Sequence, residues 1–221
     1  MLILMVRKTS NTLYNSYPSY LINLIEKISY RQRLKLYKKF CKLISFNEKD
    51  KVIDIGTTSS ENFTANVFLK KYPHKNKFTC FSNQDCRYVL NKYKCVKFVI
   101  GDARKTKFSN NSFDIVYSNA VIEHVGSFQS QRKFIKELYR ISSRVCFIVT
   151  PYRFHPIEFH TNLPFLHFLP KNIYRKILKI LGYDFLSKEE NLNLMSKNEI
   201  KKILRLSKIK KYKILNTYFL F

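Results

Sequence analysis

A histidine-rich segment, HPIEFH at 155–160, carries side chains suited to metal or proton chemistry. His155, Glu158 and His160 follow the pattern H-x-x-E-x-H, and His167 comes soon after. Imidazole and carboxylate groups suit zinc or iron(II), and a histidine can also take a proton from a hydroxyl or an amine. Because prolines break this segment and metal ligands are usually held by regular structure, we expect no metal from it. We expect Glu158 and His160 to contact an acceptor; the alternative is that the segment only packs.

A second group of polar residues stands where short apolar runs end. Asp54 and Gly56 end the run VIDIG, Asp102 and Ala103 follow KFVIG, and Asn119 follows FDIVYS. The chain has only 4 glycines, so glycines at these ends indicate a positive φ or a close approach of the backbone to a ligand. A carboxylate at 102 could accept a hydrogen bond from the exocyclic amine of a base that apolar neighbours enclose. The pattern predicts a nucleoside pocket.

The elements that must position these residues alternate between strands and helices. Helices are expected at 18–45, within 57–73, at 83–93 and at 128–143. Strands are expected at 51–56, 77–81, 96–102, 113–118 and 144–150. This alternation predicts a Rossmann-like, doubly wound and mostly parallel sheet between helical layers. In such sheets ligands bind beyond the carboxyl ends of the strands, which is where the polar residues stand.

The pattern changes after Pro151. Residues 151–170 hold four prolines and three histidines, which is typical of an insertion crossing the sheet and not of another strand–helix unit. Two helical patterns follow, at 173–186 and 196–207, and 212–221 is expected to return as strand. Since no repeat or linker interrupts the chain, we expect one domain over 1–221, with a helical extension at 1–45 and an insertion at 151–200.

The net charge of +26, from 41 Lys and Arg against 15 Asp and Glu, fits a polyanion partner. That partner could be nucleic acid or an anionic membrane surface. However, Lys, Asn, Ile, Tyr and Phe are all frequent, as an AT-rich genome produces. The basic residues are also spread along the chain, with mild concentrations at 31–42 and 201–213. Both interpretations of the charge stay open at this point.

Cysteine usage and apolar runs bear on the compartment. The 5 cysteines are odd in number and show no metal-ligand spacing, so we expect reduced thiols. The apolar start, MLILMV, is shorter than a signal peptide requires, and no other run approaches the length of a spanning helix. We therefore expect a cytoplasmic protein, with peripheral membrane contact left open.

Several blocks together resemble the class I S-adenosylmethionine-dependent methyltransferases. They are VIDIG, GDA, FSNNSFDIVYSNAVIEHV, FIKELYRI and VCFIVTPYR. The SFDIVYSNAVIEHV block is similar to the type 11-like subgroup pattern D-N-S-F-D-V-V-x-S-N-A-V-I-E-H-V. The later segments TPYRFHPIEFHTNLPFLHFLP and FLSKEENLNLMS resemble a bacterial branch with T-P-N-R-x-F-P-I-E-F-H-T. The resemblance spans about residues 45–200.

The resemblance implies S-adenosylmethionine as cofactor and assigns roles to the strand ends. Asp102 would face the adenine amino group, with Ala103 beside it. The loop with Asp54, Gly56 and Thr57 would line the methionine and ribose side, and Asn119 would lie under the methionine. Glu123 and His124 would sit near the transfer site. His124, together with Glu158 and His160 of the HPIEFH segment, makes up the set of catalytic candidates.

Two positions depart from the family pattern. Thr58 replaces the second glycine of D-x-G-x-G, and Ser82 stands where an acid usually grips the ribose hydroxyls; Asp85 could substitute for it. The acceptor implied by related functions is a glycan or lipid-linked intermediate. Two alternatives remain: an RNA methyltransferase that uses the basic surface, and a non-catalytic methyltransferase-like scaffold protein, which the two departures would suit.

Overall fold

The computed structural model describes residues 19–60, 62–93 and 96–216. Five parallel strands form one sheet in the order β3-β2-β1-β4-β5. The strands are β1 (Val52–Ile55), β2 (Phe78–Ser82), β3 (Lys97–Ile100), β4 (Phe113–Asn119) and β5 (Ser142–Val149). The chain runs outward from β1 to β3 and then returns to the other side of β1. The order therefore reverses between β1 and β4, which is where doubly wound sheets bind ligands.

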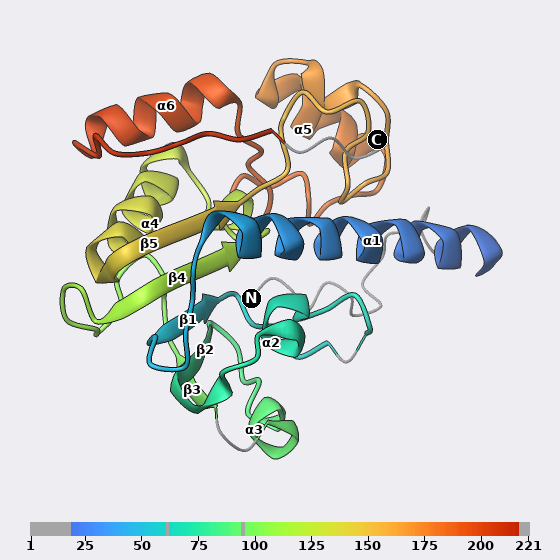
Figure 1. Ribbon diagram of the computed structural model, residues 1–221. Coiled ribbons are helices and arrows are strands. Elements are labelled where there is room, and N and C mark those ends of the chain that lie inside the picture. Colours follow the sequence, from blue (N-terminus) through green and yellow to red (C-terminus); the bar gives the residue numbers. More distant parts are fainter. Residues whose placement is uncertain (1–18, 61, 94–95, 217–221) are drawn as a thin grey trace.

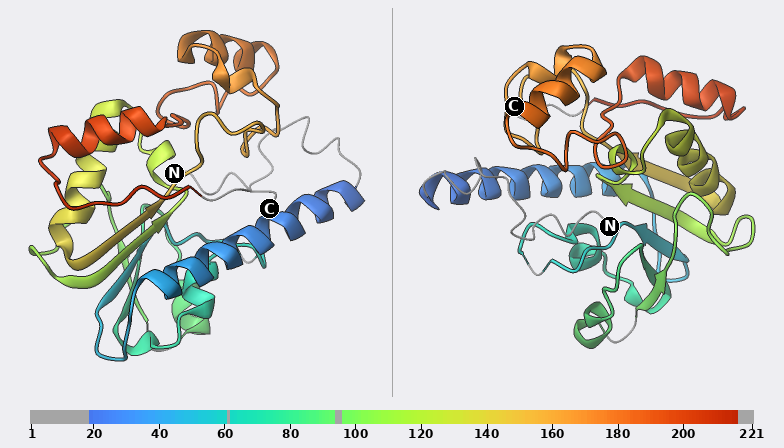
Figure 2. Two further views of the ribbon diagram at one scale, coloured as in Figure 1. Left: turned by 45° about the horizontal axis from the view of Figure 1, so that its top comes forward. Right: turned by 180° about the vertical axis from the view of Figure 1, so that it is seen from behind.

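Helices cover both faces of this sheet (Figure 1). One face packs on α1 (Ser19–Leu43), α2 (Val67–Lys71) and α3 (Tyr88–Lys92). The opposite face packs on α4 (Phe128–Ile141) and α6 (Lys197–Leu206), and the two turned views in Figure 2 show the same separation. Alternate residues of β1 feed the two cores, since Val52 joins the first and Ile53 the second. The predicted fold class is confirmed.

Residues 151–195 form a separate small core beside the sheet. It surrounds α5 (Lys171–Ile180) and includes Tyr174, Leu178 and Tyr183. Short 3₁₀ turns lie at η4 (Ile122–His124), η5 (Leu166–Phe168) and η3 (Lys75–Lys77). The segment returns to the sheet where Tyr152 pairs with Met195. A capping box then starts α6, because Ser196 and Glu199 satisfy each other's backbone N–H groups.

The helix expected within 57–73 is present as α2. It begins at Val67, after a loop that Asn66 holds together: the Asn66 side chain accepts from the Thr58 N–H and donates to the Thr58 carbonyl. One expectation about local structure is wrong in the described residues. Residues 212–216 are not strand; the rest of that expected strand lies outside the described residues, as does the apolar segment 1–6. The described cysteines are free thiols, as expected.

Candidate functional site

The carboxyl ends of the strands meet at one edge, and the predicted site residues follow it. Ile55 lies beside Phe81 of β2 and Ser118 of β4. Backbone bonds continue the alignment past the strands, since the Gly56 N–H donates to the Phe81 carbonyl and the Gly101 N–H to the Ser82 carbonyl. Parallel pairing thereby places Asp54, Gly56, Thr57, Ser82, Asp102, Ala103 and Asn119 along a common edge.

The backbone conformation and the packing of the chain require a glycine at position 56. Its φ is +103°, and a Cβ atom there would lie 2.2 Å from a methyl carbon of Val121. The sequence interpretation attributed the glycine to a positive φ or to close approach of the backbone to a ligand. The positive φ is present, but the close approach is made to Val121, in the segment between β4 and η4. This contact couples the β1 loop to the residues that lead into Glu123 and His124.

Asp54 lies on the α1–α2 face of the sheet. Its strand neighbours are Cys80 and Tyr117, and the residue is 6% exposed. Burial raises the pKa of Asp54 to about 7. A carboxylate that is costly to ionise there would be stabilised by a bound cation such as a ligand ammonium.

The two acids on the β2–β3 side pair with their own neighbours. Asp102 accepts hydrogen bonds from Arg104 at 2.7–3.0 Å, and the Arg104 bonds lower the pKa of Asp102. Asp85 pairs with Arg87 at 2.6 Å, which lowers the pKa of Asp85 to about 2. Both acids are half-exposed. A ligand that binds to either carboxylate would therefore compete with the arginine partner of that carboxylate.

Ser82 is buried and its hydroxyl is already engaged. It accepts a hydrogen bond from the Gln84 N–H and lies 3.7 Å from the Cys86 sulfur. The edge thus has no acid where β2 ends. At the end of β3, Ile100 is 54% exposed, next to Gly101, where an added Cβ atom would lie 3.0 Å from the buried Phe81 ring. The exposed Ile100 and the half-exposed Asp102 carboxylate therefore stand two residues apart at this end of the edge.

The three catalytic candidates lie together with a fourth residue, the acid Glu123. His160 Nδ1 lies 2.6 Å from Glu158 Oε1, and His160 Nε2 lies 3.0 Å from His124 Nε2. Glu123 Oε1 lies 3.9 Å from His124 Nε2 and 4.0 Å from His160 Nε2. We call Glu123, His124, Glu158 and His160 the His–Glu cluster. It begins shortly after β4 ends at Asn119, which is why cofactor edge and cluster share one neighbourhood.

Burial gives the cluster unusual electrostatics. Burial and the nearby His160 charge lower the pKa of His124 to about 3. Burial opposes ionisation of Glu158, but the attraction and hydrogen bonds of His160 outweigh it and lower the pKa of Glu158 to about 2. Burial also raises the pKa of Glu123. His160 gains most from Glu158, so its pKa is raised although burial opposes this.

Residues that the sequence analysis did not single out hold the cluster in place. His124 Nδ1 lies 2.6 Å from the carbonyl oxygen of Asn191, and Asn193 donates its N–H to the Glu123 carbonyl. The Gln131 side chain donates to the carbonyl oxygens of Ile122 and Asn193. The ENLNL run at 190–194 carried the only sequence signal, through its resemblance to the bacterial branch. His155 and His167 do not join, since each is bonded within the insertion.

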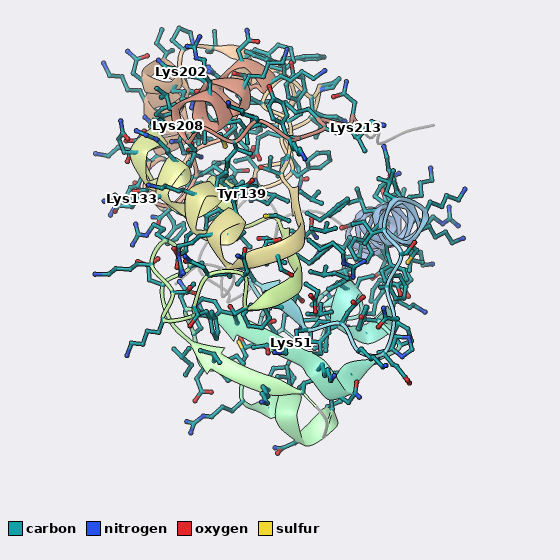
Figure 3. All side chains as sticks on the ribbon, turned by 60° about the vertical axis from the view of Figure 1, so that its left-hand side comes forward. Lys51, Lys133, Tyr139, Lys202, Lys208 and Lys213 are labelled. Carbon is teal, nitrogen blue, oxygen red and sulfur yellow. The ribbon has the colours of Figure 1, made fainter. Side chains whose placement is uncertain are left out.

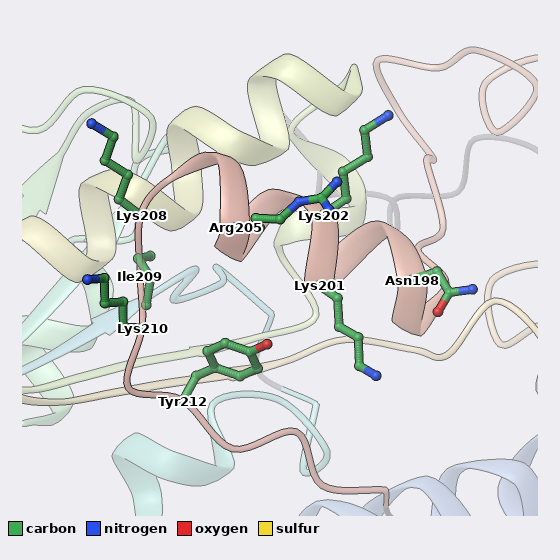
Figure 4. A pocket seen from close by; sticks show the side chains of 8 residues that line it. All are labelled: Asn198, Lys201, Lys202, Arg205, Lys208, Ile209, Lys210 and Tyr212. Carbon is green, nitrogen blue, oxygen red and sulfur yellow. The ribbon is translucent and has the colours of Figure 1, made fainter.

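A basic groove lies elsewhere, between α6 and the chain that follows it. Its volume is about 680 Å³, and none of the predicted site residues lines it. Figure 4 shows its lining of cations around Tyr212, which are Lys201, Lys202, Arg205, Lys208 and Lys210. Figure 3 shows Lys133, Lys202 and Lys208 along the side formed by α4 and α6. No helix among the described residues is long and apolar enough to cross a membrane.

Comparisons with known proteins agree with this geometry. Residues 73–147, which contain β2 to β5 up to Phe147, match the family described as a methyltransferase domain. The chain is class I methyltransferase-like. No curated protein matches the sequence significantly, so the remaining comparisons concern structure alone.

Solved structures share the fold at low sequence identity. A SAM-dependent methyltransferase of Thermotoga maritima is 17% identical with a TM-score of 0.52, covering 85% of this chain and 74% of its own. The YcgJ protein of Bacillus subtilis is 16% identical with a TM-score of 0.53, covering 77% and 66%. A phosphoethanolamine N-methyltransferase of Haemonchus contortus, in complex with S-adenosylhomocysteine, is 15% identical with a TM-score of 0.54, covering 80% and 37%. These likenesses establish the class I methyltransferase fold.

Proposed function

We propose that this protein transfers a methyl group from S-adenosylmethionine to an oxygen or nitrogen of an acceptor held beside the His–Glu cluster. The observation that carries the proposal is the position of that cluster. It follows directly from β4 at the carboxyl edge and is coupled to the Gly56 loop through Val121. A cofactor along the edge would thus have its reactive end next to buried, oriented imidazoles.

The edge residues fit the cofactor at two ends. The exposed Ile100 and the Asp102 carboxylate suit an adenine, and Asp54 suits a methionine ammonium. At the ribose, Ser82 offers only a hydroxyl that is already bonded. When bound, S-adenosylmethionine supplies an electrophilic sulfonium methyl group. We therefore expect the chain to bind the cofactor mainly through its two ends.

The cluster residues contribute orientation and proton handling. Glu158 accepts from His160 Nδ1–H, which leaves the Nε2 lone pair of a neutral His160 directed away from the carboxylate. That nitrogen can accept a proton from an acceptor hydroxyl or amine as the new bond forms. Holding the acceptor in near-attack geometry supplies most of the acceleration, on the order of 7–11 kcal/mol.

We propose the insertion as the acceptor-covering part of a single domain spanning 1–221, with 1–45 as its helical extension. The insertion exposes several large apolar side chains, namely Tyr152, Phe154, Ile157, Phe165, Phe168 and Ile173. Arg153 lies over the Phe154 ring at 5.2 Å. An apolar surface next to an arginine favours an acceptor that joins an apolar chain to an anionic group, such as a lipid-linked intermediate.

Calorimetry with S-adenosylhomocysteine tests the cofactor part of this proposal. We expect micromolar binding to the wild type and at least tenfold weaker binding to Asp102→Ala. Asp184→Ala is the matched control, since Asp184 is exposed in the insertion, and it should bind as the wild type does. A folded wild type that does not bind would contradict the proposal and favour the scaffold alternative.

The basic groove supports a second candidate function, methylation of RNA. Its five cations are surface charges that could follow a phosphate backbone. This alternative predicts that binding to mixed RNA weakens steeply with salt and that Lys201→Ala with Arg205→Ala reduces the salt slope. Binding that does not change from low to high salt would exclude it.

A further inference from the structure

The His–Glu cluster brings three electron-pair donors to one point. Glu123 Oε1, His124 Nε2 and His160 Nε2 all lie within 4.8 Å of one another. The Nδ1 atom of His124 faces a carbonyl oxygen, and the Nδ1 atom of His160 faces a carboxylate. Both of these partners can only accept, so each Nδ1 must carry a hydrogen. In the neutral rings, the two Nε2 atoms then meet with lone pairs facing each other at 3.0 Å.

Glu123 adds an independent observation. Its side chain is fully buried, and within the described part of the chain its Oε1 atom has no hydrogen-bond partner. The other oxygen, Oε2, accepts from the Thr150 hydroxyl at 3.0 Å. An unpartnered buried carboxylate oxygen is costly. Since it points at two imidazole nitrogens, the feature that would satisfy all three atoms is a cation between them.

We propose that Glu123, His124 and His160 bind a divalent first-row transition metal ion. Two imidazole nitrogens and one carboxylate oxygen suit zinc, iron(II), cobalt(II) or nickel(II), whereas magnesium and calcium prefer oxygen ligands alone. No metal was expected from the H-x-x-E-x-H segment because prolines break it and metal ligands are usually held by regular structure. Two ligands come instead from η4, outside that segment, and Glu158 supports His160 from behind.

The spacing of the nitrogens agrees with metal ligation. With metal–nitrogen bonds of about 2.0–2.1 Å, two ligands lie about 2.9 Å apart at a right angle and about 3.3 Å apart in a tetrahedron. The observed 3.0 Å falls between these values. Glu123 Oε1, at 3.9 and 4.0 Å, is roughly 0.6 Å beyond the tetrahedral spacing. A small rotation of its carboxylate would close the site.

Each ligand also has the outer partner that metal sites use to orient their ligands. Asn191 fixes His124, Glu158 fixes His160, and Thr150 fixes Glu123. The carboxylate–histidine–metal arrangement at Glu158 is a common one in zinc sites.

Three protein ligands leave at least one coordination position for another group, as in catalytic zinc sites. His160 is the most exposed of the three, at 19% of its side chain, whereas Glu123 is inaccessible. A water molecule or an acceptor oxygen would therefore approach from the His160 side. That role rests on the proposed methyltransferase function; metal binding itself does not. With an ion in place, the two Nε2 atoms serve as ligands and not as bases.

Metal titration of the EDTA-treated full chain, without S-adenosylmethionine, tests the site. We expect one equivalent of Zn²⁺ to bind with micromolar or tighter affinity, and Co²⁺ to give visible absorption bands of a nitrogen–oxygen site. Glu123→Gln and His160→Gln should weaken binding at least 100-fold. His155→Gln is the matched control, because His155 belongs to the same segment but bonds Ile157, and it should bind as the wild type does.

A thermal melt with and without Zn²⁺ separates site loss from unfolding. The ion should raise the melting temperature of the wild type and of His155→Gln, and leave that of Glu123→Gln unchanged. Glu158→Gln keeps all three ligands and should weaken binding about 10–100-fold. Wild type that binds no metal would show that a shared proton alone occupies the cluster. Equal binding to all variants would show adventitious binding; either result overturns the proposal.

The two proposals fail separately. Metal binding without S-adenosylhomocysteine binding would keep the metal site and remove the methyltransferase function. If the wild type binds S-adenosylhomocysteine in EDTA but takes up no metal, only the proposed metal site is removed.

Discussion

The two ends of the carboxyl edge hold their charges in opposite ways. At the β2–β3 end, Asp85 and Asp102 are half-exposed, and each pairs with an arginine two residues further along the chain. At the other end, Glu123 and Glu158 are buried, and the 3.0 Å contact between the Nε2 atoms of His124 and His160 joins residues 36 positions apart. An exposed ion pair between neighbours in the sequence contributes little free energy, so a ligand can replace one of its partners at low cost. A buried cluster exists only when the insertion has folded against η4, so its charges are fixed before a ligand arrives.

The largest effect should come from removing a buried acid. Glu158→Ala leaves His160 without its carboxylate and the Thr161 N–H and hydroxyl without their acceptor. Breaking a buried ion pair costs about 3–5 kcal/mol. Chemical denaturation should show this loss of unfolding free energy, whereas Asp102→Ala, which breaks an exposed pair, should stay within about 1 kcal/mol. Equal losses for the two variants would remove the contrast between the ends.

The contact that joins the two ends should give the next effect. Gly56→Ala places a Cβ atom against Val121 at a φ of +103°, and strain and overpacking together should cost about 2–3 kcal/mol. Gly101→Ala is the matched control, because the φ of Gly101 is not positive and an added Cβ atom would lie 3.0 Å from the edge of the Phe81 ring, a looser contact than at Gly56. Val121→Ala should recover part of the Gly56→Ala loss in a double-mutant cycle. No recovery would mean that φ alone explains the glycine.

These contacts show what the sequence could predict. The apolar runs gave all five strands because buried parallel strands read as continuous apolar segments. Asp102 and Asp54 were also identifiable, since strand ends locate them. The partners within the His–Glu cluster were not, because Glu123 differs from an ordinary helix acid only through contacts with Thr150 and with the 158–160 segment. The range 57–73 contained α2, but its first residue depends on Asn66, whose side chain bonds back to Thr58 over several residues.

The pH dependence of stability should separate Asp54 from the exposed acids. Its pKa is about 7 in the folded protein because of burial, against about 3.9 in an unfolded chain. Between these values the folded state holds more protons, so stability should fall as pH rises from about 4 to 7, by up to about 1.4 kcal/mol per pH unit. Asp54→Asn should flatten this slope in urea titrations. A wild-type slope that matches the variant would show that Asp54 ionises normally.

The smallest effect should follow from releasing Asp102. Arg104→Ala frees the carboxylate for a ligand amine, and an exposed pair holds it by about 1 kcal/mol or less. Calorimetry should then show S-adenosylhomocysteine binding up to about fivefold tighter than in the wild type. Lys105→Ala is a neighbouring control that removes a charge without touching Asp102. Weaker binding to Arg104→Ala would mean that the arginine itself contacts the ligand.

The structure of the protein with S-adenosylhomocysteine tests the central claim most directly. The account predicts the adenine at Ile100 and Asp102, and the sulfur on the side of the edge that faces His124 and His160. A ligand in the basic groove, or one lying on the edge with its sulfur turned away from the His–Glu cluster, would contradict it.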